Sequence, residues 1–304
     1  MNGFFNILKP TGMSSAAVVA VMRRLTGEKR VGHAGTLDPE AAGVLPIMTG
    51  KAARLFDYLT DKEKEYVAVC AFGSRTDTQD ATGEVIETGE NYPDRDTVIQ
   101  AAAELTGDIR QVPSMYSAIK VGGKPLYARA RNGETVDVPE RTVHIESIEV
   151  LRDMPEHGIE IRVRCGKGTY IRTLCEDLGT KCGCPAHMRS LMRTRSGAFT
   201  AEDALTLDEA RALADEGRLT ERILPPDWPL GHLPRTDVPA RMSKRVINGA
   251  KIPLDDRSAA IGEDQVTRIY LDGAFWGLAV RKGNELVWKA QIAPEETEES
   301  KQCE

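Results

Sequence analysis

One acidic side chain, Asp38, lies in the stretch KRVGHAGTLDPEAAGVLP of residues 29–46, among glycines and other small residues. Pro39 follows it and disfavours a helical backbone at Asp38, so the carboxylate is expected in an extended segment. Such a carboxylate can act as a general base or as a nucleophile, and its small neighbours leave space for a flat substrate. Gly, Pro and Asp are also ordinary turn formers, so the loop alone leaves a purely structural reading open.

Familiar motifs of other chemistries are missing from the sequence. The phosphate-binding pattern G-x-x-x-x-G-K-[ST], the serine-hydrolase pattern G-x-S-x-G and the zinc-peptidase pattern H-E-x-x-H do not occur. Five histidines in 304 residues make a mechanism built on histidine pairs a poor fit. Cys175, Cys182 and Cys184 precede His187, but their spacing differs from the usual zinc patterns, so we expect ordinary thiols and no metal. Carboxylate chemistry remains.

The composition, with 41% hydrophobic and 28% charged residues, is typical of soluble globular proteins. The apolar runs are too short for a membrane helix and the start does not resemble a signal peptide, so we expect a cytoplasmic protein without membrane contact. The net charge of −6 is unevenly spread, because residues 295–304 alone carry −4. Residues 162–195 hold eight Lys/Arg against two acids. This predicts a basic surface if the fold gathers the cations, and a solvated charge run is the alternative.

Hydrophobic periodicity predicts the elements that must position Asp38. The segment 2–12 favours a strand that runs into a turn, and 14–27 favours a helix capped by Ser14 and closed by Gly27. Further strands are expected at 64–73, 141–151, 158–166 and 187–197, and further helices at 51–61, 96–105, 166–179 with its end at Gly179, and 206–217 with the capping box Thr206–Glu209.

Five prolines between residues 224 and 239 predict a domain boundary near residue 230. Beyond it, alternating segments predict a small β-rich domain over 231–293, and the acidic residues 294–304 are expected to be disordered. Residues 112–141 are polar and rich in glycine, tyrosine and cations, which suits contact with an RNA backbone and unstacked bases. An exposed hairpin without a partner is the alternative for this segment.

The stretch GHAGTLDPEAAGVLP resembles the catalytic-loop signature of the pseudouridine synthases, specifically their bacterial TruB branch. Four further stretches resemble motifs of this branch in the same order: NILKPTGMSS, KEYVAVCAFGSRTDTQDATGE, VPSMYSAIKVGGKPLYARARNG and GKGTYIRTLCEDLG. The resemblance covers residues 3–200 and is weaker beyond them. Several long motifs in one order are far more specific than any one short pattern.

The resemblance implies an α+β fold with a mixed, mainly antiparallel sheet flanked by helices. It implies a catalytic domain over 1–230, an RNA-gripping insertion at about 112–141, and a PUA-like RNA-binding domain over 231–293. The implied reaction converts uridine 55 in the T arm of tRNA to pseudouridine, and the protein is expected to be a monomer. Breaking the N1–C1′ bond and joining C5 to C1′ involves no redox change, so no cofactor is expected.

The resemblance also assigns roles to individual residues. It implies that Asp38 is the catalytic carboxylate, that Tyr66 stacks on the base and serves in proton removal, and that Arg172 pairs with Asp38. An arginine in that place favours the ionised carboxylate. The residues expected to bind the target nucleotide are His33, Tyr170 and Leu191. Contacts with the RNA backbone are expected of Lys120, Lys124, Arg129, Arg131, Arg189 and Arg193.

Two other functions fit parts of the sequence. A nucleoside or glycoside hydrolase would also use a carboxylate, but it normally needs a second acid, and the loop offers only Glu40 beside Asp38. A tRNA-folding chaperone would bind RNA without using Asp38 chemically. The product of the reaction distinguishes a hydrolase from a synthase, and the effect of replacing Asp38 distinguishes a chaperone from a synthase.

Overall fold

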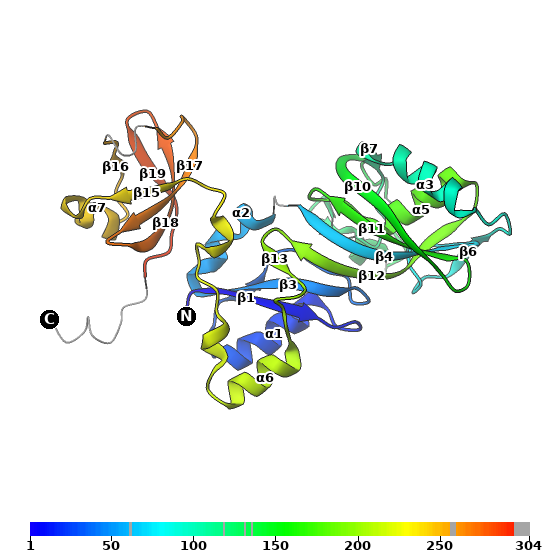
Figure 1. The fold of residues 1–304 in the computed structure, drawn as a ribbon, viewed down its shortest axis with the longest axis horizontal. Helices are drawn as coiled ribbons and strands as arrows, with labels where there is room; N and C mark the ends of the chain where they lie inside the picture. Colours follow the sequence, from blue (N-terminus) through cyan, green and yellow to red (C-terminus); the bar gives the residue numbers. More distant parts are fainter. Residues whose placement is uncertain (61–62, 118, 131, 135, 256–259, 295–304) are drawn as a thin grey trace.

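A ten-stranded sheet forms the centre of the protein, and a separate five-stranded sheet lies near the C-terminus (Figure 1). The structure is a computed structural model that describes residues 1–60, 63–117, 119–130, 132–134, 136–255 and 260–294. Among these residues, no helix combines the length and the apolar character that a membrane crossing needs.

The strands of the large sheet come from most of the first two thirds of the chain. They are β1 (Gly3–Lys9), β2 (Val31–His33), β3 (Ala42–Thr49), β4 (Lys64–Phe72), β7 (Gly107–Gln111), β10 (Arg141–Met154), β11 (Gly158–Cys165), β12 (Ala186–Ser196), β13 (Phe199–Thr200) and β14 (Leu205–Thr206). Their order is β14-β1-β3-β12-β4-β11-β10-β7, with β2 beside β3 and β13 beside β12. In this sheet, β1 and β14 are parallel, as are β3 and β12, and the other pairs are antiparallel. The predicted mixed, mainly antiparallel α+β fold is confirmed.

Four helices pack on the large sheet in two pairs. Helices α1 (Ser15–Thr26) and α6 (Leu207–Asp215) cover β1 and β3, while α3 (Arg95–Glu104) and α5 (Ile171–Cys182) cover β4, β10 and β11. Inward residues of β1, β3 and β4, such as Ile7, Leu45 and Ala68, contact these helices. The strand registers place these residues on the same face of the sheet. The middle of that face therefore lies between the two helix pairs.

The predicted helix ends are confirmed where the signal is local. Ser14 accepts a hydrogen bond from the Ala17 amide at 3.1 Å, Gly27 ends α1 with φ 65°, and Thr206 with Glu209 forms a capping box. The expected end of α5 at Gly179 is wrong, because the helix continues to Cys182. At Gly179 a Cβ would lie 2.5 Å from that of Ala186, so this glycine permits close packing of helix and strand.

The predicted helix over 51–61 is two short pieces, η1 (Gly50–Leu55) and α2 (Phe56–Thr60), and residue 61 lies outside the described part. Two small hairpins project from the large sheet. The first pairs β5 (Ser74–Thr76) with β6 (Val85–Thr88). The second, within residues 112–141, pairs β8 (Lys120–Val121) with β9 (Lys124–Pro125) and continues into α4 (Leu126–Ala130).

The C-terminal lobe is built on the five-stranded sheet, in the order β15-β17-β18-β19-β16 (Figure 1). Its elements are β15 (Arg235–Val238), η4 (Ala240–Met242), α7 (Ser243–Ile247), β16 (Ile252–Pro253), β17 (Val266–Leu271), β18 (Ala274–Lys282) and β19 (Glu285–Gln291). A link that contains η2 (Leu219–Arg222) and η3 (Trp228–Leu230) joins it to the large sheet. Leu278 and Ile292 of this lobe share an apolar cluster with Phe4, Leu55 and Leu59, so the two lobes pack together.

A single row of residues crosses the middle of the helix-bearing face. Lys9 of β1 is opposite Gly43 of β3, Gly43 is opposite Arg193 of β12, and Arg193 is opposite Tyr66 of β4. Opposite residues in a sheet point to the same side and their Cβ atoms lie about 5 Å apart. A Cβ on Gly43 (φ 115°) would lie 2.2 Å from the Arg193 carbonyl oxygen, so only glycine allows this approach.

Lys9 fastens this row to the Asp38 loop. Its side chain is fully buried, and Nζ donates to the carbonyl oxygens of Pro10 (2.9 Å), Met13 (2.5 Å) and Pro39 (2.9 Å). Burial lowers the pKa of Lys9 from 10.5 to about 8, against the opposing effect of the nearby Glu40 and Asp38 carboxylates.

The close approach at Gly43 predicts the effect of adding a methyl group there. Gly43→Ala should destabilise the protein by at least ~2 kcal/mol more than Gly217→Ala, because overpacking adds to backbone strain. Gly217 is the matched control, since it also has a positive φ (73°) but nothing lies within 4 Å of its Cβ position. Urea unfolding of both variants measures the difference in the free energy of unfolding. An equal decrease in both variants would contradict the steric argument.

The lowered pKa of Lys9 predicts a stability that depends on pH. In the unfolded chain the Lys9 ammonium keeps its proton up to about pH 10.5, whereas in the folded protein it loses this proton near pH 8. Between these pH values the unfolded state therefore binds more protons. The free energy of unfolding of the wild type should therefore rise over this window, relative to Lys9→Met, by up to about 3 kcal/mol. Urea titrations at a series of pH values test this, and parallel profiles for the two proteins would exclude it.

Candidate active site

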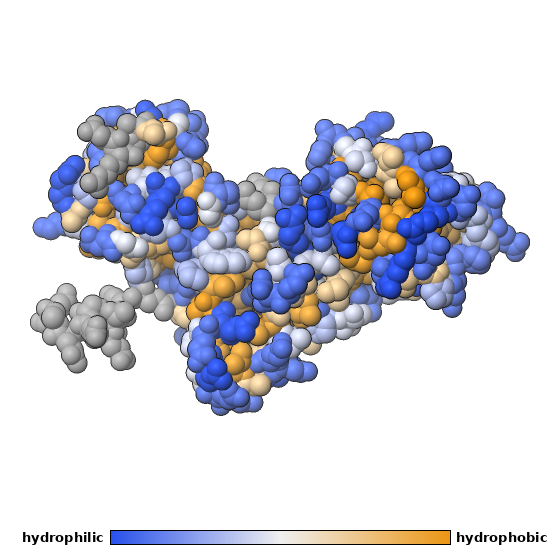
Figure 2. All heavy atoms as spheres, in the orientation of Figure 1, coloured by the Kyte–Doolittle hydropathy of each residue, from blue (hydrophilic) through white to orange (hydrophobic). Residues whose placement is uncertain are grey.

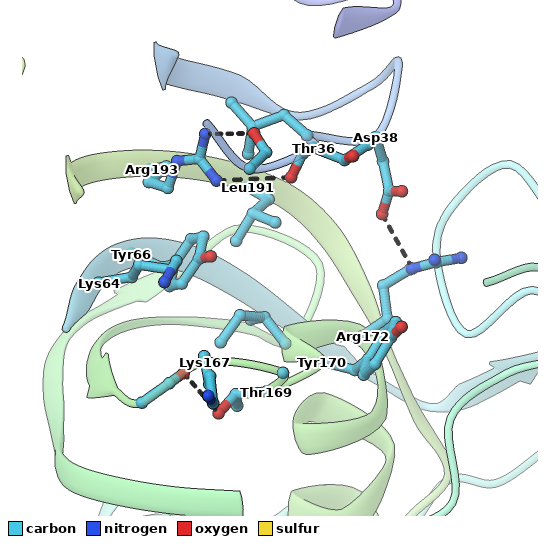
Figure 3. Close-up of a pocket in the computed structure, with 15 residues that line it drawn as sticks. Thr36, Asp38, Lys64, Tyr66, Lys167, Thr169, Tyr170, Arg172, Leu191 and Arg193 are labelled. Carbon is cyan, nitrogen blue, oxygen red and sulfur yellow. Dashed lines mark hydrogen bonds and ion pairs between the residues drawn. The ribbon is translucent and has the colours of Figure 1, made fainter. Parts of the chain in front are cut away.

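A cavity of about 280 Å³ opens at the middle of the helix-bearing face (Figure 3). This is slightly below the ~300–1,000 Å³ typical of small-molecule pockets, so it suits a ligand of limited size. Its walls come from the Asp38 loop, from β4 and β12, and from the segment that leads into α5. The lining residues are Gly35, Thr36, Leu37, Asp38, Lys64, Tyr66, Gly166, Lys167, Gly168, Thr169, Tyr170, Ile171, Arg172, Leu191 and Arg193.

The backbone on both sides of Asp38 is fastened to other elements. The Ser15 hydroxyl at the start of α1 donates to the Leu37 carbonyl at 3.0 Å and accepts from the Leu37 amide at 2.9 Å. The Pro39 carbonyl accepts from Lys9 and from the Gly12 amide. The side chain of Asp38 itself is 40% exposed. The carboxylate is thus accessible while its backbone is held in place.

Arg172, near the start of α5, makes the ion pair with Asp38. Its Nε lies 3.1 Å from Asp38 Oδ2, and the arginine side chain is only 7% exposed. The other two nitrogens donate to the carbonyls of Thr78 and Tyr116, each at 3.3 Å. One guanidinium thus connects the Asp38 loop, the β5–β6 hairpin and the segment over 112–141. The carboxylate is oriented by a group that is itself held from three sides.

A second carboxylate, Asp80, supports Arg172 from the side away from Asp38. Its Oδ2 lies 3.5 Å from Arg172 Nη1. Its Oδ1 accepts from the Thr78 hydroxyl (2.8 Å), the Thr82 hydroxyl (2.6 Å) and the Thr82 amide (3.0 Å). Asp80 does not belong to the residues that line the cavity. It therefore acts on the site through the position of Arg172.

Tyr66 forms the inner wall of the cavity, with Arg193 beside it (Figure 3). Burial raises the pKa of Tyr66 above its ordinary value, because the charged phenolate is disfavoured there. The guanidinium of Arg193 opposes this shift by its charge and by a hydrogen bond to the phenol. A neutral phenol is the stable form, and the neighbouring cation makes its ionised form less costly.

Five of the residues predicted for catalysis or for nucleotide binding line the same cavity, and two of them, Asp38 and Arg172, are in direct contact. Asp38, Tyr66 and Arg172 all line the cavity, as do the predicted pocket residues Tyr170 and Leu191. His33 does not belong to the cavity-lining set. The Nδ1 atom of His33 is buried and makes no hydrogen bond. The pKa of His33 is lowered, mainly by burial and to a lesser extent by the positive charge of Arg193.

Arg193 does not fit the predicted contact with the RNA backbone. It is only 1% exposed, and its guanidinium donates to the carbonyls of Val44 (2.8 Å), Gly35 (3.1 Å) and Thr36 (3.4 Å). In the described chain no acid pairs with it. These three bonds hold the loop that carries Asp38 against β12, so Arg193 is a structural part of the cavity wall.

The other cations predicted to contact RNA have varied surroundings. Arg189 is held by the carbonyls of Pro155 and Glu156, and Arg129 donates to the Val121 carbonyl and pairs with Glu134. Lys124 is exposed at the turn of the β8–β9 hairpin. The side chain of Lys120 and the whole of Arg131 lie outside the described part.

The basic run over 162–195 is not gathered into one free surface. Six of its eight cations pair with acids of other segments: Arg162 with Glu149, Arg164 with Glu65, Arg172 with Asp38, Lys181 with Glu104, Arg189 with Glu156 and Arg195 with Glu63. The condition for a basic surface is thus not met, because contacts with other segments place an acid next to six of the eight cations.

Several residues that build the site were not singled out from the sequence. Lys9 and Ser15 lie in the quoted stretch NILKPTGMSS, and Asp80 lies in SRTDTQDATG. The motifs thus contained these residues, but no local pattern distinguishes a buried lysine or a supporting aspartate from an exposed one. Their roles depend on partners that lie far along the chain.

None of the described cysteines belongs to the residues that line the cavity. The Cys70 thiol is directed at the Cys175 carbonyl at 3.6 Å, and both side chains are buried between the sheet and α5. Burial raises the pKa of Cys182 to about 11, so it is a thiol at neutral pH. Within the described residues, no three or more His, Cys, Asp or Glu side chains are arranged to hold a metal ion.

Two family models match the sequence. The N-terminal domain of the TruB family of pseudouridylate synthases matches residues 23–171, and the C-terminal domain of tRNA pseudouridylate synthase B matches residues 172–230. The chain is 45% identical to tRNA pseudouridine synthase B of Bacillus licheniformis, over 82% of each protein. It is 42% identical to that of Alkaliphilus oremlandii, over 92% of this chain and 93% of the relative.

Solved structures share the fold. A crystal structure of a Cbf5-Nop10-Gar1 complex contains a chain with a TM-score of 0.73 and 27% identity, over 96% of this chain and 85% of that one. An H/ACA RNP bound to a substrate RNA containing 2′-deoxyuridine also matches with a TM-score of 0.73, at 26% identity and the same coverage. By sequence and by fold, the chain belongs to the TruB family of pseudouridylate synthases.

Proposed function

We propose that this protein converts uridine 55 in the T arm of tRNA to pseudouridine, with Asp38 as the catalytic carboxylate. The observation that carries the proposal is the accessible Asp38 carboxylate, ion-paired to the buried Arg172, at a cavity with Tyr66 on its wall. The relatives named tRNA pseudouridine synthase B support tRNA as the substrate.

The roles follow from the bonds that change. The N1–C1′ bond of the uridine breaks, the uracil turns, C5 bonds to C1′, the hydrogen on C5 leaves as a proton, and N1 takes up a proton, so the composition is unchanged. Asp38 acts on the nucleoside either as a nucleophile or as a base for a sugar proton. Tyr66 stacks on the base and serves in removal of the C5 proton, and Arg193 beside it favours the ionised phenol. Arg172 orients Asp38 through their ion pair.

The acids around the cavity favour isomerisation over hydrolysis. Among the described residues that line this cavity, Asp38 is the one acid, and Glu40, Asp80 and Glu160 instead line a neighbouring cavity that Asp38 also borders. A glycoside hydrolase normally uses two carboxyl groups, one of which activates water or protonates the leaving group. Asp80 cannot supply the second group, because its oxygens are occupied by Thr78, Thr82 and Arg172.

The substrate must expose its target base before reaction. Extruding a nucleotide costs a few kcal/mol, and stacking on an aromatic ring such as Tyr66 offsets part of this. We assign residues 1–230 to catalysis, with the insertion at about 112–141 gripping the T arm, and residues 231–293 to further RNA binding. Tyr170, Leu191 and His33 would accommodate the extruded nucleotide. The protein would act as a monomer in the cytoplasm.

Replacing the carboxylate tests the assignment directly. Asp38→Asn should lower the turnover number by about 10²–10⁴-fold or more and leave the affinity for tRNA unchanged. The reason is that an amide neither attacks the nucleoside nor accepts its proton. Tritium release from tRNA labelled at C5 of uridine measures turnover. Glu40→Gln is the control in the same loop, since Glu40 does not line this cavity but borders the neighbouring one, and it should keep most of the activity.

The products separate the three functions. A synthase yields an isomer of unchanged mass, and a hydrolase yields free uracil. Modification by Asp38→Asn at the wild-type rate would refute the role of the carboxylate. A protein that only folds tRNA should still complement a deletion strain when it carries this substitution.

The support of Arg172 by Asp80 gives a further prediction. Asp80→Asn should lower the turnover number on the order of 10²-fold with little change in KM, because Arg172 loses its second carboxylate and misorients Asp38. Single-turnover and steady-state assays on tRNA separate the two parameters. Asp203→Asn, an exposed acid bonded to Thr200, is the control. A rise in KM alone would mean that Asp80 contributes to binding instead.

A further inference from the structure

Gln111 ends β7, the edge strand of the large sheet, and immediately precedes the insertion over 112–141. In Figure 1, β7 and β10 lie at the outer edge of this sheet, and Figure 2 shows that the surface at this edge of the molecule is mainly hydrophilic. A glutamine at such an edge has water within reach, yet Gln111 is only 1% exposed. A buried amide needs hydrogen-bond partners, so the partners of Gln111 indicate what it does.

Both polar atoms of the Gln111 side chain bond to the backbone of Tyr170. Oε1 accepts from the Tyr170 amide at 3.0 Å, and Nε2 donates to the Tyr170 carbonyl at 3.2 Å. The side chain of Gln111 also makes a hydrogen bond with the carboxylate of Asp177 in α5. Gln111 thus pairs with Tyr170 as a neighbouring strand would, although Tyr170 belongs to no strand.

Tyr170 needs this support because it lies in an irregular segment. It precedes α5 with an extended backbone, and its side chain makes no capping hydrogen bond to the helix. The turn before it contains Gly168 at φ 79°. Within the described residues, Gln111 Oε1 is the only acceptor of the Tyr170 amide. Gln111 therefore satisfies a backbone group that neither the turn nor the helix satisfies.

The residue opposite Gln111 contacts the ring of the same tyrosine. Arg141, the first residue of β10, pairs with Gln111 across the edge of the sheet, and opposite residues point to the same side. The central carbon of the Arg141 guanidinium lies 5.8 Å from the centroid of the Tyr170 ring, within the range of a cation–π attraction. The two residues at the ends of the insertion thus hold the backbone and the ring of Tyr170.

The position of Tyr170 matters because its side chain lines the cavity (Figure 3). The cavity has a volume of about 280 Å³, so a flat base fits it only if the walls keep their places. A shift of about 1 Å in the position of a bound reactant can lower a rate by about 10²-fold. Gln111 does not belong to the residues that line the cavity, so it acts on a bound base only through Tyr170 or its neighbours.

We propose that Gln111 is a positioning residue, which holds the backbone of Tyr170 and thereby fixes one wall of the pocket for the extruded uracil. The inference rests on the proposed function for the identity of the base. It gives the start of the insertion a second task besides contact with RNA, since the strand that leads into the insertion also holds a wall of the cavity.

Two variants of Gln111 and one matched control test this inference. Gln111→Met removes both hydrogen bonds with little change in volume. Gln111→Asn keeps an amide but is one methylene too short to reach, and it replaces the first variant if that one does not fold. Thr49→Val is the control, because it removes a buried hydrogen bond to the Gly3 carbonyl in the same sheet, away from the cavity. Each protein is assayed for its melting temperature, its dissociation constant for tRNA, and its single-turnover rate of tritium release at saturating tRNA.

The Gln111 variants should lower the single-turnover rate by about tenfold or more and change the dissociation constant for tRNA by less than about twofold. The control should keep the wild-type rate. In a protein that already carries Tyr170→Ala, the same Gln111 substitution should lower the rate by less than about twofold, because the side chain that it positions is absent. A purely structural role of Gln111 would not produce this dependence on Tyr170.

The inference is overturned if the Gln111 variants react at the wild-type rate, or if Thr49→Val loses as much. It is also overturned if the full loss persists beside Tyr170→Ala, since Gln111 would then act through Arg172 or through the fold. Hydrogen exchange gives a readout that does not depend on catalysis: the amides over residues 166–174 should exchange faster in Gln111→Met than in the wild type. Unchanged exchange there refutes the inference even if the protein is a synthase, whereas a wild type that does not isomerise tRNA refutes the proposed function instead.

Discussion

The ion pair between Arg172 and Asp38 is the interaction on which the site depends. A nearly buried guanidinium is costly to desolvate, and it is stable here because two carboxylates and two backbone carbonyls surround it. These partners come from three segments that are far apart in the chain. The same set of bonds therefore orients the carboxylate and joins the Asp38 loop, the β5–β6 hairpin and the segment over 112–141.

The central strands of the large sheet support this ion pair from one side. Lys9, Gly43, Arg193 and Tyr66 form one row across four strands, and each has a different use. Gly43 lets β3 and β12 approach closely, and Lys9 and Arg193 donate hydrogen bonds to carbonyl groups of the Asp38 loop. Tyr66 forms part of the wall of the cavity. Two buried cations that bind carbonyls can hold an irregular loop without adding acids that would compete with Asp38 for Arg172.

Charge is divided between the parts of the molecule according to use. In the large sheet, Arg162, Arg164 and Arg195 pair with acids of neighbouring segments, which stabilises the packing of the strands. Around α7, Arg241 and Lys244 have no acid partner among the described residues, whereas Lys251 pairs with Glu285.

Much of this protein was determined by short stretches of its sequence. The ends of α1 at Ser14 and Gly27 and the capping box at Thr206 depend on contacts within a few residues. The family motifs likewise identified Asp38, Tyr66 and Arg172. Only the tertiary structure decided that α5 passes Gly179, that Arg193 is a buried support, and that Lys9 and Asp80 hold the site. The physical reason is that burial and hydrogen-bond partners depend on strand pairing between residues as distant as Gly43 and Arg193, which no local pattern specifies.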